Sequence, residues 1–134
     1  MQNLLGDLIT RIYNGQQARL GAIILHPATP KSCLLVLDLL RDEGYILGYN
    51  LWYDPKLKRT FLKVLLKYSA YGAPAIKKIF QISKPTRRIY ISTVILWKPK
   101  ASAGLYILST PKGLLTDRDA RLLNVGGELL LGIY

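Results

Sequence analysis

The sequence has little of the chemistry on which disulfide-stabilised proteins, zinc proteins and most enzymes depend. Its only cysteine is Cys33 and its only histidine is His26, so an internal disulfide and an ordinary Cys/His zinc site are both excluded. The longest apolar runs, such as 34–37 and 94–97, fall far short of the ~20 residues that cross a bilayer. Walker and Gly-x-Gly-x-x-Gly phosphate-binding motifs are also missing.

Acidic residues are scarce as well. Eight Asp and Glu residues stand against 19 Lys and Arg residues, which gives a net charge of +11. Such an excess is costly in self-repulsion unless an anionic partner compensates it, so a polyanion is the first partner to consider. With 134 residues, half of them apolar, the chain can bury a core but is too short for a large multi-domain enzyme.

Apolar periodicity in the first half of the chain predicts an α-β-α-β-β order. The pattern over 4–13 is helical, with Asn3 as N-cap and Asn14-Gly15 as the stop. Thr29 and Pro30 are a cap and first residue for a second helix that Gly44 ends. The remaining predicted elements are a strand over 20–25 and a hairpin of strands 45–52 and 60–68 around the turn Asp54-Pro55-Lys56.

The second half is predicted to be mainly antiparallel β with one short helix. That helix has Thr116 as its cap, Asp119 in its first turn and Asn124 at its end. The strands are predicted over 76–82, 88–93, 105–108 and 128–134. The fold class is therefore α+β, with an N-terminal subdomain over 1–68, a linker rich in small residues over 69–74, and a C-terminal β-rich subdomain over 75–134.

The side chains that could catalyse a reaction have simpler structural explanations. His26 stands next to Pro27 at a strand end, and the carboxylates lie where they complement helix dipoles. Cys33, in the first turn of a helix, is interpreted as a small packed thiol rather than a reactive one. A small enzyme that uses Cys33 or a carboxylate is thus ranked below two other functional hypotheses, which are introduced below.

Basic residues, accompanied by aromatic ones, are the more informative feature. Each basic cluster alone is typical of a solvated surface, but several lie in or beside loops of the second half, where they can converge on a polyanion. Most nearby aromatic residues are expected in the core, and Tyr90, next to Arg87-Arg88, is left open. The clusters are Lys56-Lys58-Arg59, Lys77-Lys78, Lys84-Arg87-Arg88 and Lys98-Lys100.

Two short segments have compositions suited to nucleic-acid contact. Residues 109–113 combine two hydroxyls, a cation and a glycine, and can offer donors to phosphate or ribose oxygens; the alternative is an ordinary hairpin turn. In residues 126–128, two glycines allow close backbone approach, and Glu128 could accept hydrogen bonds from base amino groups or 2′-hydroxyls. There the alternative is a bulge with a salt-bridged glutamate.

Taken in order along nearly the whole chain, several short motifs resemble one family, ribosomal protein eight of the small subunit, in its bacterial and organellar form. The most specific motifs are Ser-Thr-x-Lys-Gly over 109–113, Thr-Asp-x-x-Ala-Arg over 116–121 and Gly-Gly-Glu over 126–128. Motifs at 7–14, 43–46, 82–85 and 88–90 precede them.

The resemblance implies a two-domain α+β protein that binds the central domain of small-subunit rRNA directly and supports subunit assembly and translation. It implies neighbouring ribosomal proteins as further partners, and no enzymatic activity, cofactor, small-molecule substrate or membrane insertion. The rRNA-binding residues carried over by motif in the C-terminal half are Lys84, Arg87, Arg88, Tyr90, Ser109, Thr110, Lys112, Gly113, Gly126, Gly127 and Glu128. Those of the N-terminal half are Thr10, Arg11, Asn14 and Lys31.

The sequence also departs from the family pattern. Tyr13 and Gly15 replace the usual Arg and Ala, and residues 92–103 fit the family poorly, so no function is carried over from that segment. The Leu-, Ile- and Tyr-rich composition and the expected absence of a presequence resemble an organelle-encoded, mitochondrial member, with plastid and bacterial origins left open. A basic nucleic-acid-binding module outside the ribosome is the alternative function.

Overall fold

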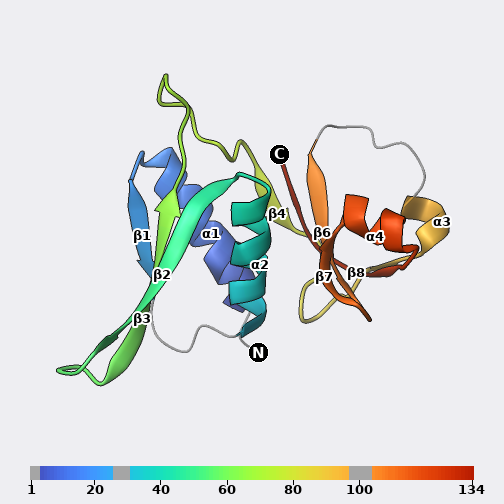
Figure 1. Ribbon diagram of the computed structural model, residues 1–134, viewed down its shortest axis with the longest axis horizontal. Coiled ribbons are helices and arrows are strands. Elements are labelled where there is room, and N and C mark those ends of the chain that lie inside the picture. Colours follow the sequence, from blue (N-terminus) through green and yellow to red (C-terminus); the bar gives the residue numbers. More distant parts are fainter. Residues whose placement is uncertain (1–3, 26–30, 97–103) are drawn as a thin grey trace. The chain divides into compact units, whose positions relative to one another are not determined.

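The computed structural model describes residues 4–25, 31–96 and 104–134 (Figure 1). The contacts within the chain separate these residues into two units, Leu4–Ile76 and Lys77–Tyr134. Residues 69–74, the predicted linker, lie in the first unit. The predicted cap Asn3 and the predicted helix start at Thr29 and Pro30 lie outside the described residues.

The N-terminal unit has the predicted α-β-α-β-β order. Its sheet has the strand order β1-β3-β2 and is antiparallel throughout, which confirms the predicted hairpin. Strand ends differ from the prediction by no more than two residues. The elements are α1 (Leu4–Gln17), β1 (Ala22–Leu25), α2 (Lys31–Asp42), β2 (Ile46–Asp54) and β3 (Arg59–Leu66).

The predicted end of the first helix at Asn14-Gly15 is wrong, because α1 continues to Gln17. Tertiary contacts hold this last turn. Gly15 is buried, and a Cβ at that position would come within 2.6 Å of Ile23 Cγ2. The buried Gln16 donates from Nε2 to the carbonyl of Lys67 at 2.9 Å and accepts from the backbone N–H of Ile76 at 3.1 Å. These contacts outweigh the low helix propensity of glycine.

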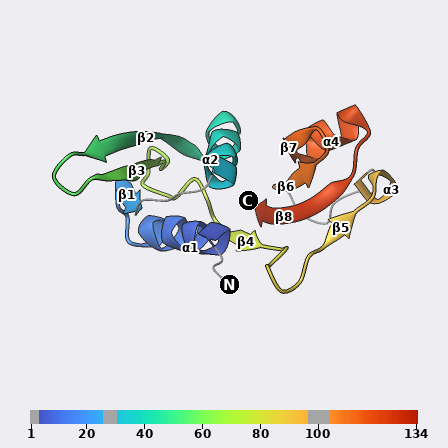
Figure 2. The same ribbon diagram turned by 90° about the horizontal axis from the view of Figure 1, so that it is seen from below.

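One face of this sheet carries the core of the unit. Leu62, Val64 and Leu66 of β3 are buried, and they alternate with partly exposed residues that point to the other face. Both helices contribute fully buried side chains, including Ile12 and Leu37. Figures 1 and 2 show that the far end of the β2–β3 hairpin extends beyond both helices.

The C-terminal unit is built on an antiparallel sheet with the order β4-β8-β6-β7, and β5 also pairs with β8. Ile107 and Leu131 are fully buried in this sheet. The elements are β4 (Ile79–Gln81), β5 (Tyr90–Ile91), α3 (Thr93–Leu96), β6 (Leu105–Thr110), β7 (Gly113–Thr116), α4 (Asp117–Leu123) and β8 (Gly127–Ile133).

Most of this arrangement was predicted, but two predicted strands are shorter than expected and one strand was not predicted. The predicted caps are confirmed: Thr116 Oγ1 accepts from the N–H of Asp119 at 3.3 Å, and Asn124 adopts the left-handed conformation at the end of α4. The strand predicted over 76–82 spans only Ile79–Gln81. The strand predicted over 88–93 spans only Tyr90–Ile91, and Thr93 begins the short helix α3, which contacts α4. The β-branched residues of 93–95 favour a strand locally, so packing overrides propensity here. Strand β7 was not predicted.

No helix in the described part of the chain is long and apolar enough to cross a membrane. Among the same residues, no group of three or more His, Cys, Asp or Glu side chains is arranged to hold a metal ion.

Candidate nucleic-acid interface

Three predicted site residues form a row across the C-terminal sheet. Tyr90 of β5 is the register partner of Glu128 of β8, and Glu128 is also the register partner of Ser109 of β6. Directly paired residues of antiparallel strands point to the same face, so the three side chains lie side by side. Tyr90 is 71% exposed and Ser109 is also exposed. Tyr90 therefore does not belong to the core.

The two glycines before Glu128 make this row possible. A Cβ on Gly127 would lie 2.2 Å from the carbonyl oxygen of Ser109, and a Cβ on Gly126 would lie 2.5 Å from that of Ile91. Such contacts are impossible for any residue with a side chain. The close backbone approach expected of these glycines is thus made, in this structure, by the protein's own strands β6 and β5.

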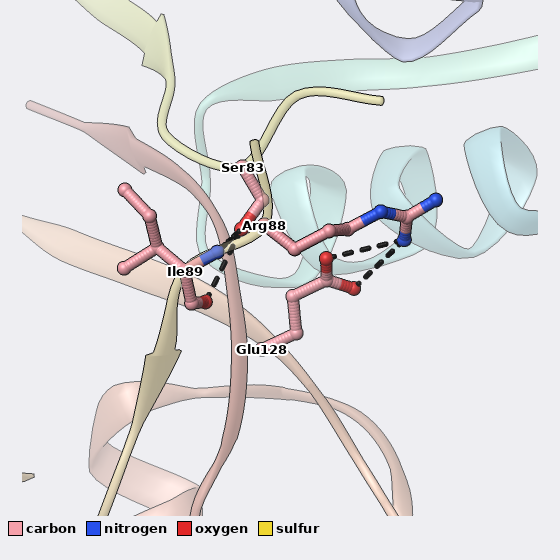
Figure 3. A network of polar contacts seen from close by, with 4 residues as sticks. All are labelled: Ser83, Arg88, Ile89 and Glu128. Carbon is pink, nitrogen blue, oxygen red and sulfur yellow. Dashed lines mark hydrogen bonds and ion pairs between the residues drawn. The ribbon is translucent and has the colours of Figure 1, made fainter. Parts of the chain in front are cut away.

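Glu128 is paired with Arg88 (Figure 3). The Nη1 atom of Arg88 lies 3.3 Å from Oε1 and 3.2 Å from Oε2 of Glu128, while Nη2 and Nε take no part in this ion pair. The glutamate side chain is 11% exposed and the arginine side chain 57%. The salt-bridged glutamate considered as an alternative is therefore observed. The pair orients a largely exposed guanidinium next to Tyr90.

Ser83 shapes the basic loop that leads to Arg88. Its buried hydroxyl accepts from the N–H of Ile89 at 2.9 Å and donates to the carbonyl of Ile89 at 3.2 Å (Figure 3). Within the loop, Lys84 and Arg87 exchange backbone hydrogen bonds of 2.8 and 2.9 Å, and both side chains are exposed. Sequence reasoning did not single out Ser83 as a positioning residue, although a serine two residues before Pro85 is a turn signal.

The β6–β7 connection is the hairpin turn that sequence analysis considered. Thr110 Oγ1 donates to the carbonyl of Gly113 at 2.8 Å and accepts from the N–H of Lys112 at 3.2 Å, so the hydroxyl proton is used inside the turn. Gly113 has a φ of +109°, which strains any other residue. Lys112 is exposed at the tip. Thr110 thus fixes the shape of the turn, while Lys112 and Ser109 face solvent.

The four predicted site residues of the N-terminal unit are all exposed, but only two of them line the same cleft. Arg11 and Asn14 line an open cleft with Ala22 and Ile23. Arg11 also pairs with Asp7 at 3.3 Å. The other two residues do not line this cleft. Thr10 donates its hydroxyl proton to the carbonyl of Gly6 at 2.8 Å, and Lys31 is the first residue of α2.

Two of the side chains that could catalyse a reaction, Cys33 and Asp117, are buried. Cys33 is 2% exposed, and its burial raises the pKa of the thiol, which opposes the thiolate that a nucleophile needs. Asp117, also 2% exposed, accepts from the backbone N–H of Tyr106 at 3.2 Å and from Arg121 at 3.1 Å. The interpretation of Cys33 as a packed thiol is confirmed.

Comparison with known proteins gives consistent matches. A family model described as ribosomal protein S8 matches residues 3–134. The chain is 46% identical over 134 residues to small ribosomal subunit protein uS8 of Erythrobacter litoralis, covering 100% of this chain and 98% of the relative. The proteins of the same name from Rhodospirillum centenum and Bartonella quintana are 45% identical over 130 residues (97% and 96% covered) and 40% identical over 134 residues (100% and 98% covered).

Proposed function

The chain belongs to the ribosomal protein S8 family, and from this premise we propose that it is a structural constituent of the small ribosomal subunit that binds small-subunit rRNA directly. In this role it supports subunit assembly and translation beside neighbouring ribosomal proteins. The family is one of structural ribosomal proteins, so the chain is not an enzyme.

The observation that carries the proposal is the exposed surface around the Tyr90–Glu128–Ser109 row. Cations border this row on the Ser83–Ile89 loop and at the β6–β7 turn, and the acid within the row is neutralised by Arg88. An aromatic ring, a hydroxyl and several cations on one sheet face are the groups that a distorted RNA helix can use. The exposed cations are Lys84, Arg87, Arg88 and Lys112.

The chemistry of RNA explains how these groups would act. A-form RNA hides its bases in a deep major groove, so proteins recognise its shape, its 2′-hydroxyls and its unpaired bases. Ser109 can bond to a 2′-hydroxyl or phosphate oxygen, and Tyr90 can stack on an unpaired base. The lysines and arginines supply affinity through counterion release, and Arg88 adds a forked contact that a lysine cannot make.

Equilibrium binding to the central-domain rRNA helix, compared with a scrambled duplex of equal length across salt concentrations, tests the proposal. We expect selective binding that persists at ~0.2 M salt. Lys112→Ala should lower the salt slope by about one, as one lost phosphate contact predicts. Thr110→Ala should lower the affinity by more than this change in salt slope explains, because the turn loses both hydrogen bonds of the Thr110 hydroxyl. Equal binding to both RNAs would contradict the proposal and favour the alternative, a basic module outside the ribosome.

The exposed predicted residues of the N-terminal unit are proposed as additional phosphate contacts. Arg11, Asn14 and Lys31 can each approach a phosphate, and the Arg11 side chain stays 47% exposed in its pairing with Asp7. Thr10 contributes only indirectly, because its hydroxyl proton is donated to the carbonyl of Gly6 within α1. Tyr13 takes the place of an arginine in the family motif, so this contact is expected to be weaker than in other members.

We further propose that the ribosome concerned is mitochondrial, on the basis of the Leu-, Ile- and Tyr-rich composition. The relatives compared above are bacterial, and they bear on the family but not on the compartment. Fractionation of the source cells, with detection by mass spectrometry, should find the protein sedimenting with mitochondrial small subunits. Sedimentation with ribosomes of another compartment would contradict this assignment.

A further inference from the structure

The sheet of the N-terminal unit has a second face with an unusual composition, which we call the open face. Its members are identified by the register: Trp52 pairs with Phe61, and Lys63 pairs with both Asn50 and Ile24. Arg59, two residues before Phe61 on β3, points the same way. Asp54 pairs with Arg59, so the open face includes Ile24, Asn50, Trp52, Asp54, Arg59, Phe61 and Lys63.

The aromatic pair at the centre of this face is stacked and accessible. The ring centroids of Trp52 and Phe61 are 5.6 Å apart with an interplanar angle of 27°. Trp52 is nevertheless 40% exposed, and Ile24 nearby is 57% exposed. By contrast, the opposite face of β3 is formed by side chains that the helices bury. A large, rigid aromatic surface is therefore presented to solvent.

Cations flank this aromatic pair along the central strand. Arg59, Phe61 and Lys63 alternate on β3, so a cation lies ~7 Å to either side of the Phe61 position. The hairpin from residue 46 to 66 contains four cations and one acid. That acid, Asp54, lies opposite Arg59 on the same face, and its Oδ1 accepts from the N–H of Lys56 at 2.9 Å. With Arg59 and Lys63 against Asp54, the face has a net positive charge as well as an aromatic pair.

We propose that the open face is a platform for single-stranded RNA, on which Trp52 and Phe61 stack with unpaired bases while Arg59 and Lys63 contact the phosphates. This combination of stacking rings and backbone cations is how sequence-tolerant single-strand sites bind. A protein partner is disfavoured because Lys63 lies in the middle of the face, where protein interfaces exclude charge. The inference rests on the proposed function, because a protein of the small subunit has single-stranded segments of rRNA available to bind.

The test uses the full chain and a fluorescently labelled decauridylate, a length within the range that such sites cover. Trp52→Leu and Phe61→Leu keep apolar volume but remove a ring, and each should weaken binding about 5- to 100-fold. Tyr53→Leu is the matched control, because Tyr53 is the next residue on β2, points to the opposite face and is 58% exposed. It should change binding by less than about twofold. Circular dichroism verifies that each variant is folded.

A spectroscopic measurement separates stacking from charge attraction. In a Trp97→Phe background Trp52 is the sole tryptophan, and its fluorescence should be quenched by decauridylate but not by heparin, a polyanion without bases. Absence of quenching, or equal binding by Trp52→Leu and the parent, would overturn the platform. Unchanged decauridylate binding together with poorer incorporation of Trp52→Leu into small subunits would assign the face to a protein partner, and would overturn it too.

The same variants distinguish this inference from the proposed function. Trp52→Leu should bind the duplex central-domain helix within about twofold of the parent, whereas Lys112→Ala should lower the salt slope of that binding. If the rRNA helix is bound selectively but Trp52→Leu does not weaken decauridylate binding, the platform proposal fails and the proposed function stands. If decauridylate binding depends on Trp52 but the helix is not selected over scrambled duplex, the proposed function fails instead.

Discussion

Replacing Gly127 with alanine is expected to destabilise the C-terminal unit by about 3 kcal/mol, the upper end of the usual range for overpacking a tight site. The added Cβ would lie 2.2 Å from the carbonyl oxygen of Ser109 and 3.1 Å from the Cα of Thr110. Both are backbone atoms of β6, so no side-chain rotation can relieve the overlap. Strands β6 and β8 must move apart, and Ser109 then loses its place beside Glu128.

Thermal unfolding followed by circular dichroism measures this effect, with rRNA-helix binding as a second readout. Gly21→Ala is the control, because nothing lies within 4 Å of the place that its Cβ would take and its φ is not positive. Its stability should stay within about 0.5 kcal/mol of the parent. A Gly127→Ala variant that unfolds at the parental temperature would show that β6 and β8 tolerate the added methyl group.

Removing three exposed cations together should lower affinity for the central-domain helix about 100-fold. The variant carries Lys84→Ala, Arg87→Ala and Lys112→Ala, and three lost phosphate contacts predict a salt slope smaller by about three. Because all three side chains are exposed, stability should change by no more than about 0.5 kcal/mol. Binding measured between about 0.05 and 0.3 M salt provides both numbers.

The matched control removes the same number of charges from the β2–β3 hairpin, through Lys56→Ala, Lys58→Ala and Arg59→Ala. It should reduce affinity for the duplex helix less than threefold. If both triple variants lose affinity equally, the binding depends on total charge, and the surface around Tyr90 has no special role. The comparison of the two triple variants therefore separates the effect of net charge on affinity from the effect of where the charges lie.

The sequence was sufficient to predict the α+β class and most elements, because apolar periodicity and capping residues act locally. Thr116 begins α4 by capping it and Asn124 ends it in the left-handed conformation. Both signals act within the helix itself and do not depend on tertiary contacts. The exceptions have tertiary causes. Gly15 and Gln16 remain helical because Ile23, Lys67 and Ile76 meet them, and none of these contacts can be read from the helix sequence.

The candidate site was predicted as a set of residues but not as an arrangement. That Tyr90 stands beside Glu128 depends on the register of β5 against β8, which also brings together Arg88 and Glu128, 40 residues apart in the sequence. The hydroxyl of Thr110 and the carboxylate of Glu128 look available in the sequence. In the structure the first shapes a turn and the second holds Arg88, so their contributions to binding are indirect.

The position of β8 in the sheet has a consequence for how the protein is made. This strand leaves the ribosome after all the other described strands, yet it is the partner of β4, β5 and β6. Until it emerges, β4 and β5 have no neighbour in the sheet, whereas β6 and β7 can already form a hairpin. Long-range pairings of this kind are slow to form. The N-terminal unit, complete once Ile76 has emerged, can therefore fold during translation, while the surface around Tyr90 assembles only after β8 has been synthesised.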